Sequence, residues 1–315
     1  MKTHPSIRKG FTLIELLTAM AITTVIIGVL IGATRMSMDA WKDSRDKARA
    51  SRLAKESIEL MSHDLEGIVI RSGNEYEWLS IRMDGTLAST DLGPSANAEM
   101  KNPLEFVFFS AATDRYDGAI GTATDNGGDI STVIYKLVYK DQFEGSGGMQ
   151  FPVFSLYRYL INPDMTFDNY LAKPDIQSLA AAEAVTNANN FIAENVYNLT
   201  VTLIFEFNNV ATGVMEQQRV PVMTSGNDFQ EIRIKGNMVA KDALASPTAA
   251  NIVDSNGVNV ASSARLAGAE LGILVLSDSG MRGLNKKQFA GDAAFAKFVK
   301  QNSHYFTKSV VMPRP

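Results

Sequence analysis

The sequence predicts an α+β fold in which a long, apolar N-terminal helix precedes an antiparallel β-sheet head with insertions. One observation is an apolar segment near the N-terminus that carries a single charge and is followed by apolar residues at helical spacing. The other is a series of aromatic and β-branched runs, bounded by Gly, Asp and Pro, along much of the remaining chain.

The apolar segment covers residues 11–33, and its only charged residue is Glu15. A helix of these 23 residues would be roughly 34 Å long, enough for a hydrocarbon core of about 30 Å. Lys2, Arg8 and Lys9 precede it, so the positive-inside rule predicts a cytoplasmic N-terminus. The segment exceeds the roughly 7–15-residue apolar region of a secretory signal. A plain membrane anchor leaves Glu15 unexplained, because a carboxylate costs about 2.5–3.5 kcal/mol near the centre of a membrane helix.

The junction between the basic and apolar stretches reads Lys9-Gly10-Phe11-Thr12-Leu13-Ile14-Glu15-Leu16-Leu17. It resembles the class III signal of type IV pilins and type II secretion pseudopilins. The resemblance implies that a prepilin peptidase cuts between Gly10 and Phe11, and that the new Phe11 amine is N-methylated. It further implies that Glu15 faces the N-terminal amine of a neighbouring subunit, since a buried carboxylate should be paired. The partners so implied are other pilins or pseudopilins and an inner-membrane assembly platform.

Two glycines late in the apolar segment allow two interpretations. Gly28 and Gly32 lower helix propensity, so the helix could melt locally in a filament, as the resemblance to major pilins with proline near Gly32 implies. The same glycines could instead permit close packing between helices. Both interpretations stay open.

The chain divides into four predicted parts. These are a cleaved cytoplasmic leader (1–10), a transmembrane and filament-core helix (11–33), an amphipathic continuation (34–71) and a periplasmic β-rich head (72–315). The continuation is predicted from apolar residues three to seven positions apart, most of them three or four: Trp41, Ala48, Ala54, Ile58, Met61, Leu65 and Ile68. Ser72-Gly73-Asn74 then predicts its end.

The head is predicted to consist mainly of strands. These are Glu77–Met83, Leu104–Ser110, Thr132–Tyr139, Gln150–Leu160, Val196–Phe207, Phe229–Gly236, Leu271–Leu276 and His304–Pro315. An alanine-rich stretch at residues 173–190 and residues 285–301 favour helices. Within the resembled family, the C-terminal part is most similar to J-type minor pseudopilins. That similarity rests on Met61–Glu66, Val196–Val201 and a final segment of aromatic, basic, Val-Val and Pro residues.

Composition and motifs exclude several classes of chemistry. The chain has no cysteine, which rules out disulfides, thiolate metal sites and a cysteine nucleophile. Its net charge of −4 argues against a nucleic-acid-binding surface. His4, His63 and His304 lack metal-ligand spacing, and no P-loop, G-x-S-x-G or Rossmann pattern occurs. The sequence therefore predicts a protein that is not an enzyme and leaves ATP hydrolysis to a partner.

One acidic, glycine-rich stretch suits a hard cation. Asp114, Asp117, Asp125 and Asp129 could supply oxygen ligands to Ca²⁺, and several pseudopilins in the resembled family bind calcium. Their spacing does not match an EF-hand, and Asp and Gly are also typical of exposed turns. Apart from this weak Ca²⁺ candidate, the sequence predicts no cofactor.

The function expected is that of a minor pseudopilin in the bacterial inner membrane, assembled into a type II secretion pseudopilus or a type IV pilus. The large head favours a position near the filament tip, because bulky insertions would obstruct packing along a shaft. An alternative is a membrane-tethered adhesin or binding module that is exported by the pilin route. An anchored hydrolase is the weakest alternative, since no catalytic constellation is visible.

Overall fold

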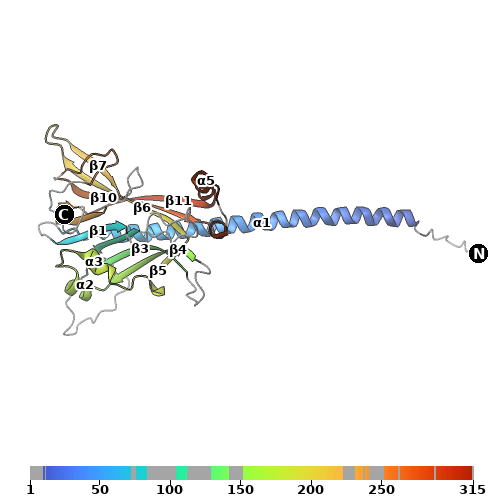
Figure 1. Ribbon diagram of the computed structural model, residues 1–315, viewed down its shortest axis with the longest axis horizontal. Helices are drawn as coiled ribbons and strands as arrows, with labels where there is room; N and C mark the ends of the chain where they lie inside the picture. Colours follow the sequence, from blue (N-terminus) through green and yellow to red (C-terminus); the bar gives the residue numbers. More distant parts are fainter. Residues whose placement is uncertain are drawn as a thin grey trace, which may run out of the picture. The chain divides into compact units, whose positions relative to one another are not determined.

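The computed structural model describes residues 10, 12–71, 76–83, 104–111, 129–141, 152–222, 231–236, 238–240, 252–261, 263–286 and 289–313. The chain divides into two compact units, Met1–Asp46 and Lys47–Pro315, and the second is called the head from here on. A long apolar helix precedes antiparallel sheets, which confirms the predicted α+β class (Figure 1).

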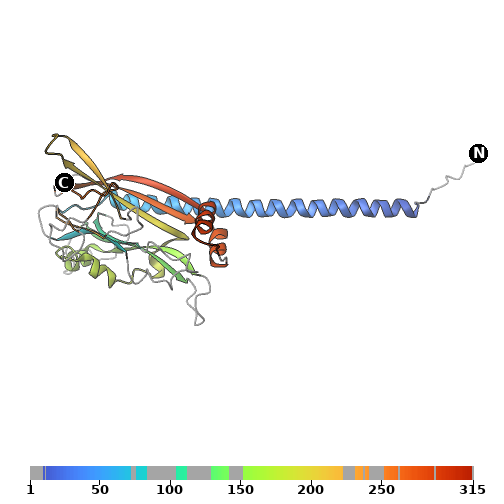
Figure 2. The same cartoon turned by 45° about the horizontal axis from the view of Figure 1, so that its top comes forward.

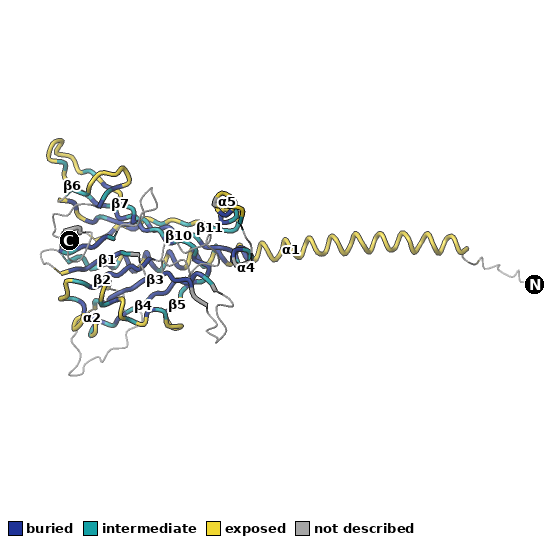
Figure 3. The backbone as a smooth tube through the Cα atoms, in the orientation of Figure 1, coloured by how far each residue is buried: buried dark blue, intermediate teal, exposed yellow. Residues whose placement is uncertain are grey.

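The first unit consists of the N-terminal part of helix α1, which runs from Leu13 to Glu66. All residues from 12 to 45 are exposed (Figure 3). A stretch of α1 is long and apolar enough to cross a membrane, judged by length and composition. Its threonine hydroxyls donate to backbone oxygens four residues back, as Thr23 does to Ala19 (2.8 Å) and Thr24 to Met20 (2.8 Å). These hydroxyls need no water, which suits an apolar surrounding.

Within the head, the C-terminal part of α1 contributes one apolar stripe to the core. The stripe is buried and consists of Ala50, Ala54, Ile58, Met61 and Leu65. The two N-terminal members of the predicted stripe, Trp41 and Ala48, are exposed, so the burial of apolar side chains starts at Ala50. Spacings of four, four, three and four residues keep these side chains on one face of the helix.

Helix α1 ends at Glu66, before the predicted Arg71. The chain leaves the helix at Gly67, and the next residues pair with strand β2 (Leu104–Ser110). Val69 N–H donates to the Phe109 carbonyl (2.9 Å), and Ala111 N–H donates to the Gly67 carbonyl (2.9 Å). The helix stops early because this backbone is used in β pairing. The predicted stop at residues 72–74 lies outside the described residues.

Among the described residues, the larger sheet of the head has seven strands, and every neighbouring pair is antiparallel. Their order is β5 (Phe191–Glu194), β4 (Pro152–Ile161), β3 (Ser131–Asp141), β2, β1 (Glu77–Met83), β8 (Ile232–Lys235) and β9 (Met238–Ala240). All seven residues of β2 are buried, so this strand runs through the core. β1 and β2 have the predicted bounds.

The smaller sheet has four antiparallel strands. Their order is β11 (Ser303–Val311), β10 (Arg265–Leu276), β6 (Val196–Asn208) and β7 (Met215–Pro221), visible together in Figure 2. Only Asn195, at a φ of 62°, separates β5 of the larger sheet from β6 of the smaller. Its carbonyl accepts from Leu276 N–H (2.8 Å), which links this junction to the end of β10.

Several elements differ from the prediction. The alanine-rich stretch forms only the short helix α3 (Ile176–Ala181) and a 3₁₀ turn at Ala188–Asn190, and α2 (Pro163–Asn169) precedes them. The predicted late helix is two helices, α4 (Asp278–Lys286) and α5 (Asp292–Asn302). Gly291, at a φ of 103°, breaks the helical conformation directly before α5. Strand β7 was not predicted because its sequence, MEQQRVP, is mostly polar.

Candidate processing and assembly site

The start of α1 forms a reciprocal capping arrangement between Thr12 and Glu15. The Glu15 carboxylate accepts from the backbone N–H of Thr12 (2.8 Å) and from its hydroxyl (2.9 Å). Glu15 N–H lies 3.4 Å from the Thr12 hydroxyl oxygen. These contacts satisfy groups that every helix N-terminus leaves open. The one carboxylate of the apolar segment is thus held by its own chain, four residues after the predicted cleavage product begins at Phe11.

The other two predicted site residues, Gly10 and Phe11, precede this cap in the sequence. Gly10 is exposed, and a Cβ added there would meet no atom within 4 Å. Among the described residues, packing therefore does not require glycine at position 10. Phe11 lies outside the described residues. Thr12 is the functional residue that sequence reasoning missed, although T-x-x-E directly before an apolar run is the signature of a capping box.

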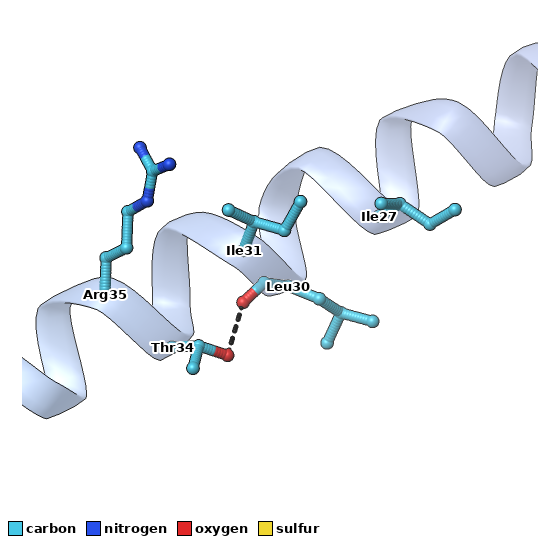
Figure 4. Close-up of a pocket in the computed structure, with 5 residues that line it drawn as sticks. All are labelled: Ile27, Leu30, Ile31, Thr34 and Arg35. Atoms are coloured by element: carbon cyan, nitrogen blue, oxygen red, sulfur yellow. Dashed lines mark hydrogen bonds between the residues drawn. The ribbon is translucent and has the colours of Figure 1, made fainter.

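Further along α1, the side chains of Ile27, Leu30, Ile31, Thr34 and Arg35 line an open, apolar hollow (Figure 4). The Thr34 hydroxyl donates to the Leu30 carbonyl (2.8 Å), so the hollow has no free hydroxyl on that side. The helix is continuous through Gly28 and Gly32, and a Cβ at either position would meet nothing within 4 Å. The surface of a single apolar helix like this one favours contact with lipid or other helices.

The candidate calcium ligands fall mostly outside the described residues. Asp114, Asp117 and Asp125 lie there, whereas Asp129 is exposed shortly before β3. Among the described residues, no group of three or more His, Cys, Asp or Glu side chains could hold a metal ion. The calcium site therefore stays a prediction.

In the head, a buried ion pair joins α1 to the larger sheet. The Arg158 guanidinium on β4 donates to both oxygens of the Asp64 carboxylate, at 2.7 and 2.8 Å. The Tyr135 hydroxyl on β3 donates to the same carboxylate, and burial together with that negative charge raises the pKa of Tyr135 well above its usual range. Asp64 and Arg158 are buried, so this cluster is closed to solvent and pins α1 to the sheet.

Asp64 lies in the stretch Met61–Glu66, but the sequence alone does not predict that it forms this ion pair. The position of Asp64 in the sequence nevertheless indicates burial, because it lies three residues after Met61 and four before Ile68, on the apolar stripe of α1. A charge on a buried stripe indicates a partner elsewhere in the fold. The partner, Arg158, lies 94 residues away in sequence and could not be identified from the pattern alone.

A second buried cluster surrounds Glu77 at the start of β1. Its carboxylate accepts from the backbone N–H of Ile176 (2.7 Å) and lies 3.3 Å from the Arg233 guanidinium of β8. Burial raises the pKa of Glu77 to about 7, although Arg233 counteracts the increase. Arg233 also pairs with Asp175 (2.7 Å) and Glu231 (2.5 Å). Partial burial opposes ionisation of Asp175, but hydrogen bonds from Ser178 and Arg233 outweigh it and lower its pKa to about 2.

The comparison with known families locates its match at the N-terminus. The prokaryotic N-terminal methylation motif matches residues 6–31, a span that contains Gly10, Phe11 and the Thr12–Glu15 cap. No curated protein and no solved structure matches the chain. The motif supports a type IV pilin-like family and a pilin-type protein that a prepilin peptidase processes. The exposed, apolar N-terminal part of α1 fits a pilin anchored in the inner membrane.

Proposed function

We propose that this chain is a non-enzymatic minor pseudopilin, cleaved after Gly10, N-methylated at Phe11 and assembled into a type II secretion pseudopilus or type IV pilus. The observation that carries the proposal is the Thr12–Glu15 cap, which lies inside the matched motif at the start of a helix whose residues 13–45 are exposed. An inner-membrane assembly platform would move the processed chain from the membrane into the filament.

The Glu15 carboxylate supplies the driving force for assembly. Among the described residues of the single chain, its partners are neutral donors of Thr12, which do not compensate the negative charge. In an apolar surrounding an uncompensated charge is costly, whereas an ammonium group at hydrogen-bond distance offsets much of that cost. The Phe11 amine of a neighbouring subunit would provide that ammonium group. Glu15 would thereby disfavour the isolated chain in lipid and set the axial register of the filament.

The basic residues before Gly10 would keep the N-terminus in the cytoplasm and place the head in the periplasm.

The size of the head supports a position near the filament tip. It contains a seven-stranded and a four-stranded sheet, and such a bulky head would obstruct regular packing along a shaft. The J-type subtype stays a prediction, based on the similarity of residues 61–66 and 196–201. Counting copies per filament by quantitative mass spectrometry tests the tip position, which thousands of copies would refute.

Three substitutions at the cap test the role of Glu15 in assembly. Glu15→Ala removes both the cap and the charge, whereas Glu15→Gln keeps an acceptor for Thr12 and removes only the charge. Thr12→Ala keeps the charge and weakens the cap, at a cost of about 1 kcal/mol. We expect both Glu15 variants to be cleaved normally and to reach sheared filaments at least about tenfold less often than wild type, as loss of about 1.4 kcal/mol would cause. Thr12→Ala should assemble more efficiently than either.

The readouts are the N-terminal peptide mass, which reports cleavage and methylation, and immunoblots of the membrane and sheared-filament fractions. If Glu15→Gln assembles like wild type while Glu15→Ala fails, Glu15 acts as a helix cap and the pairing proposal is wrong. If all three variants assemble normally, neither the cap nor the charge drives assembly.

A further inference from the structure

The outer face of the four-stranded sheet presents a regular set of side chains to solvent. Along β11, Tyr305, Thr307, Ser309 and Val311 are exposed, while the residues between them are half-buried or buried. In the strand register these four lie opposite Leu274, Gly272, Glu270 and Gly268 of β10. Side chains of alternate residues point to the same side of a sheet, so these positions share one face.

On this face, the Tyr305 ring packs over a glycine. A Cβ added at Gly272 would lie 3.1 Å from Cε2 of Tyr305 and 2.5 Å from its hydroxyl oxygen. The ring therefore occupies the space that a side chain at position 272 would fill. Tyr305 is directly opposite Leu274, so its ring crosses the sheet diagonally. Tyr305 is nevertheless 58% exposed, which means that one side of the ring rests on the sheet and the other is open.

The polar side chains of this face are hydroxyl groups and paired charges. Thr307 and Ser309 are exposed on β11, and Thr200 lies opposite Gly272 on β6. The two carboxylates described on this face each have an arginine partner. Glu270 forms an ion pair with Arg219, and Glu206 lies 3.4 Å from Arg265. The face therefore offers hydrogen-bonding groups and a flat aromatic surface with no excess charge among these residues.

We propose that this face binds a neutral oligosaccharide, with one sugar ring stacked on Tyr305. A sugar ring has a flat face of C–H groups and a rim of hydroxyls. The C–H groups, which carry a slight positive charge, are attracted to the negative face of an aromatic ring, and burying both surfaces removes apolar area from water. The rim hydroxyls would bond to Thr307 and Ser309, and those of neighbouring sugar units to the Glu270–Arg219 pair.

The charge pattern favours this ligand over others. An anionic lipid surface or an acidic polymer would require uncompensated lysines or arginines, whereas Arg219 and Arg265 are paired with carboxylates. A helix or loop of another protein would favour protruding apolar anchors over a ring that rests against its own sheet. The inference concerns the head alone and goes beyond assembly through Glu15.

The test measures binding of soluble oligosaccharides to the processed full-length chain. The chain is kept in a zwitterionic detergent, because sugar-based detergents would compete for the site. Isothermal titration with cellohexaose, chitohexaose and maltohexaose should detect binding of at least one of them. Tyr305→Ala should weaken this binding at least about tenfold, the equivalent of about 1.4 kcal/mol. Tyr305→Phe, which keeps the ring, should stay within about threefold of wild type.

Phe167→Ala is the matched control, since Phe167 is an exposed aromatic residue on α2 of the head. It should bind like wild type. The thermal unfolding of each variant identifies any that fails to fold. If Tyr305→Ala fails to fold, binding is compared instead between Tyr305→Phe, which keeps the ring in place, and Gly272→Ser. The serine side chain should displace the Tyr305 ring and abolish binding. The proposal is overturned if wild type binds none of the three sugars, if Tyr305→Ala binds as well as wild type, or if Tyr305 proves necessary for binding anionic vesicles instead. Because Glu15→Ala leaves the head unchanged, that variant should still bind the sugar, so failure of assembly and failure of sugar binding are separable.

Discussion

The two units of the chain satisfy their polar groups in different ways. From residue 12 to residue 45, the described hydrogen bonds are local, such as Glu15 to Thr12 and Thr18 to Ile14, and the apolar side chains are exposed. In the head, buried charges have partners far away in sequence, such as Asp64 with Arg158. The first unit is therefore complete in its backbone but incomplete in its packing, which other molecules must supply. The head supplies its own packing.

The largest effect expected from this comparison is at Gly10, which no contact within the described part of the chain requires. Gly10→Val should abolish cleavage, because the substitution affects recognition by the prepilin peptidase and not the fold. Intact-mass measurement of the membrane-embedded chain should show a retained leader, and thermal unfolding of the head should be unchanged. A cleaved Gly10→Val chain would contradict the assigned processing site.

The head should respond in the opposite manner, because its charges have internal partners. Arg158→Met leaves the Asp64 carboxylate buried without its guanidinium, which should reduce the free energy of unfolding by about 3–5 kcal/mol. Arg52→Met is the control, since Arg52 forms an exposed pair with Glu56 (3.6 Å) on α1, and it should cost less than about 1 kcal/mol. Urea unfolding monitored by tryptophan fluorescence measures both. Replacing both partners, as Asp64→Leu with Arg158→Met, should be less damaging than Arg158→Met alone; equal damage would argue against an unpaired charge as the cause.

A smaller effect is expected from pH, through Glu77. Its folded-state pKa of about 7 exceeds the ordinary value of 4.5, so folding favours the protonated form. The stability that this proton contributes is fully present below pH 4.5 and is lost as the pH rises from 4.5 to 7. Asp175 behaves in the opposite sense, because its lowered pKa of about 2 contributes stability above pH 3.8 that is lost as the pH falls towards 2.

Glu77→Gln should therefore flatten the pH dependence of stability between pH 4.5 and pH 7. The expected change across this interval is about 1–3 kcal/mol, since one unit of pKa corresponds to about 1.4 kcal/mol. Thermal unfolding of wild type and Glu77→Gln at pH 5.0 and pH 7.5 measures it. Parallel changes in the two proteins would show that Glu77 does not titrate in this interval.

Much of the fold followed from local patterns. The strands β1 and β2 have the predicted bounds because their aromatic and β-branched runs are bounded by turn residues. β10 begins at Arg265, before the predicted Leu271. Its first half was not predicted because it contains Gly268 and small alanines, which have little intrinsic preference for strands. Polar β7 likewise becomes a strand only because it pairs with β6. In both cases, pairing with a neighbouring strand outweighs local propensity.

The sequence by itself determined the pilin-like N-terminus, including Gly10, Phe11 and Glu15 as the candidate processing and assembly residues. It could do so because this motif is contiguous and its periodic, apolar pattern reports a helix directly. Only the tertiary structure decided that the head has two sheets, that Asp64 meets Arg158 and that Tyr305 covers Gly272. The physical reason is that strand order and register depend on contacts between distant segments, and no local pattern specifies which segments meet.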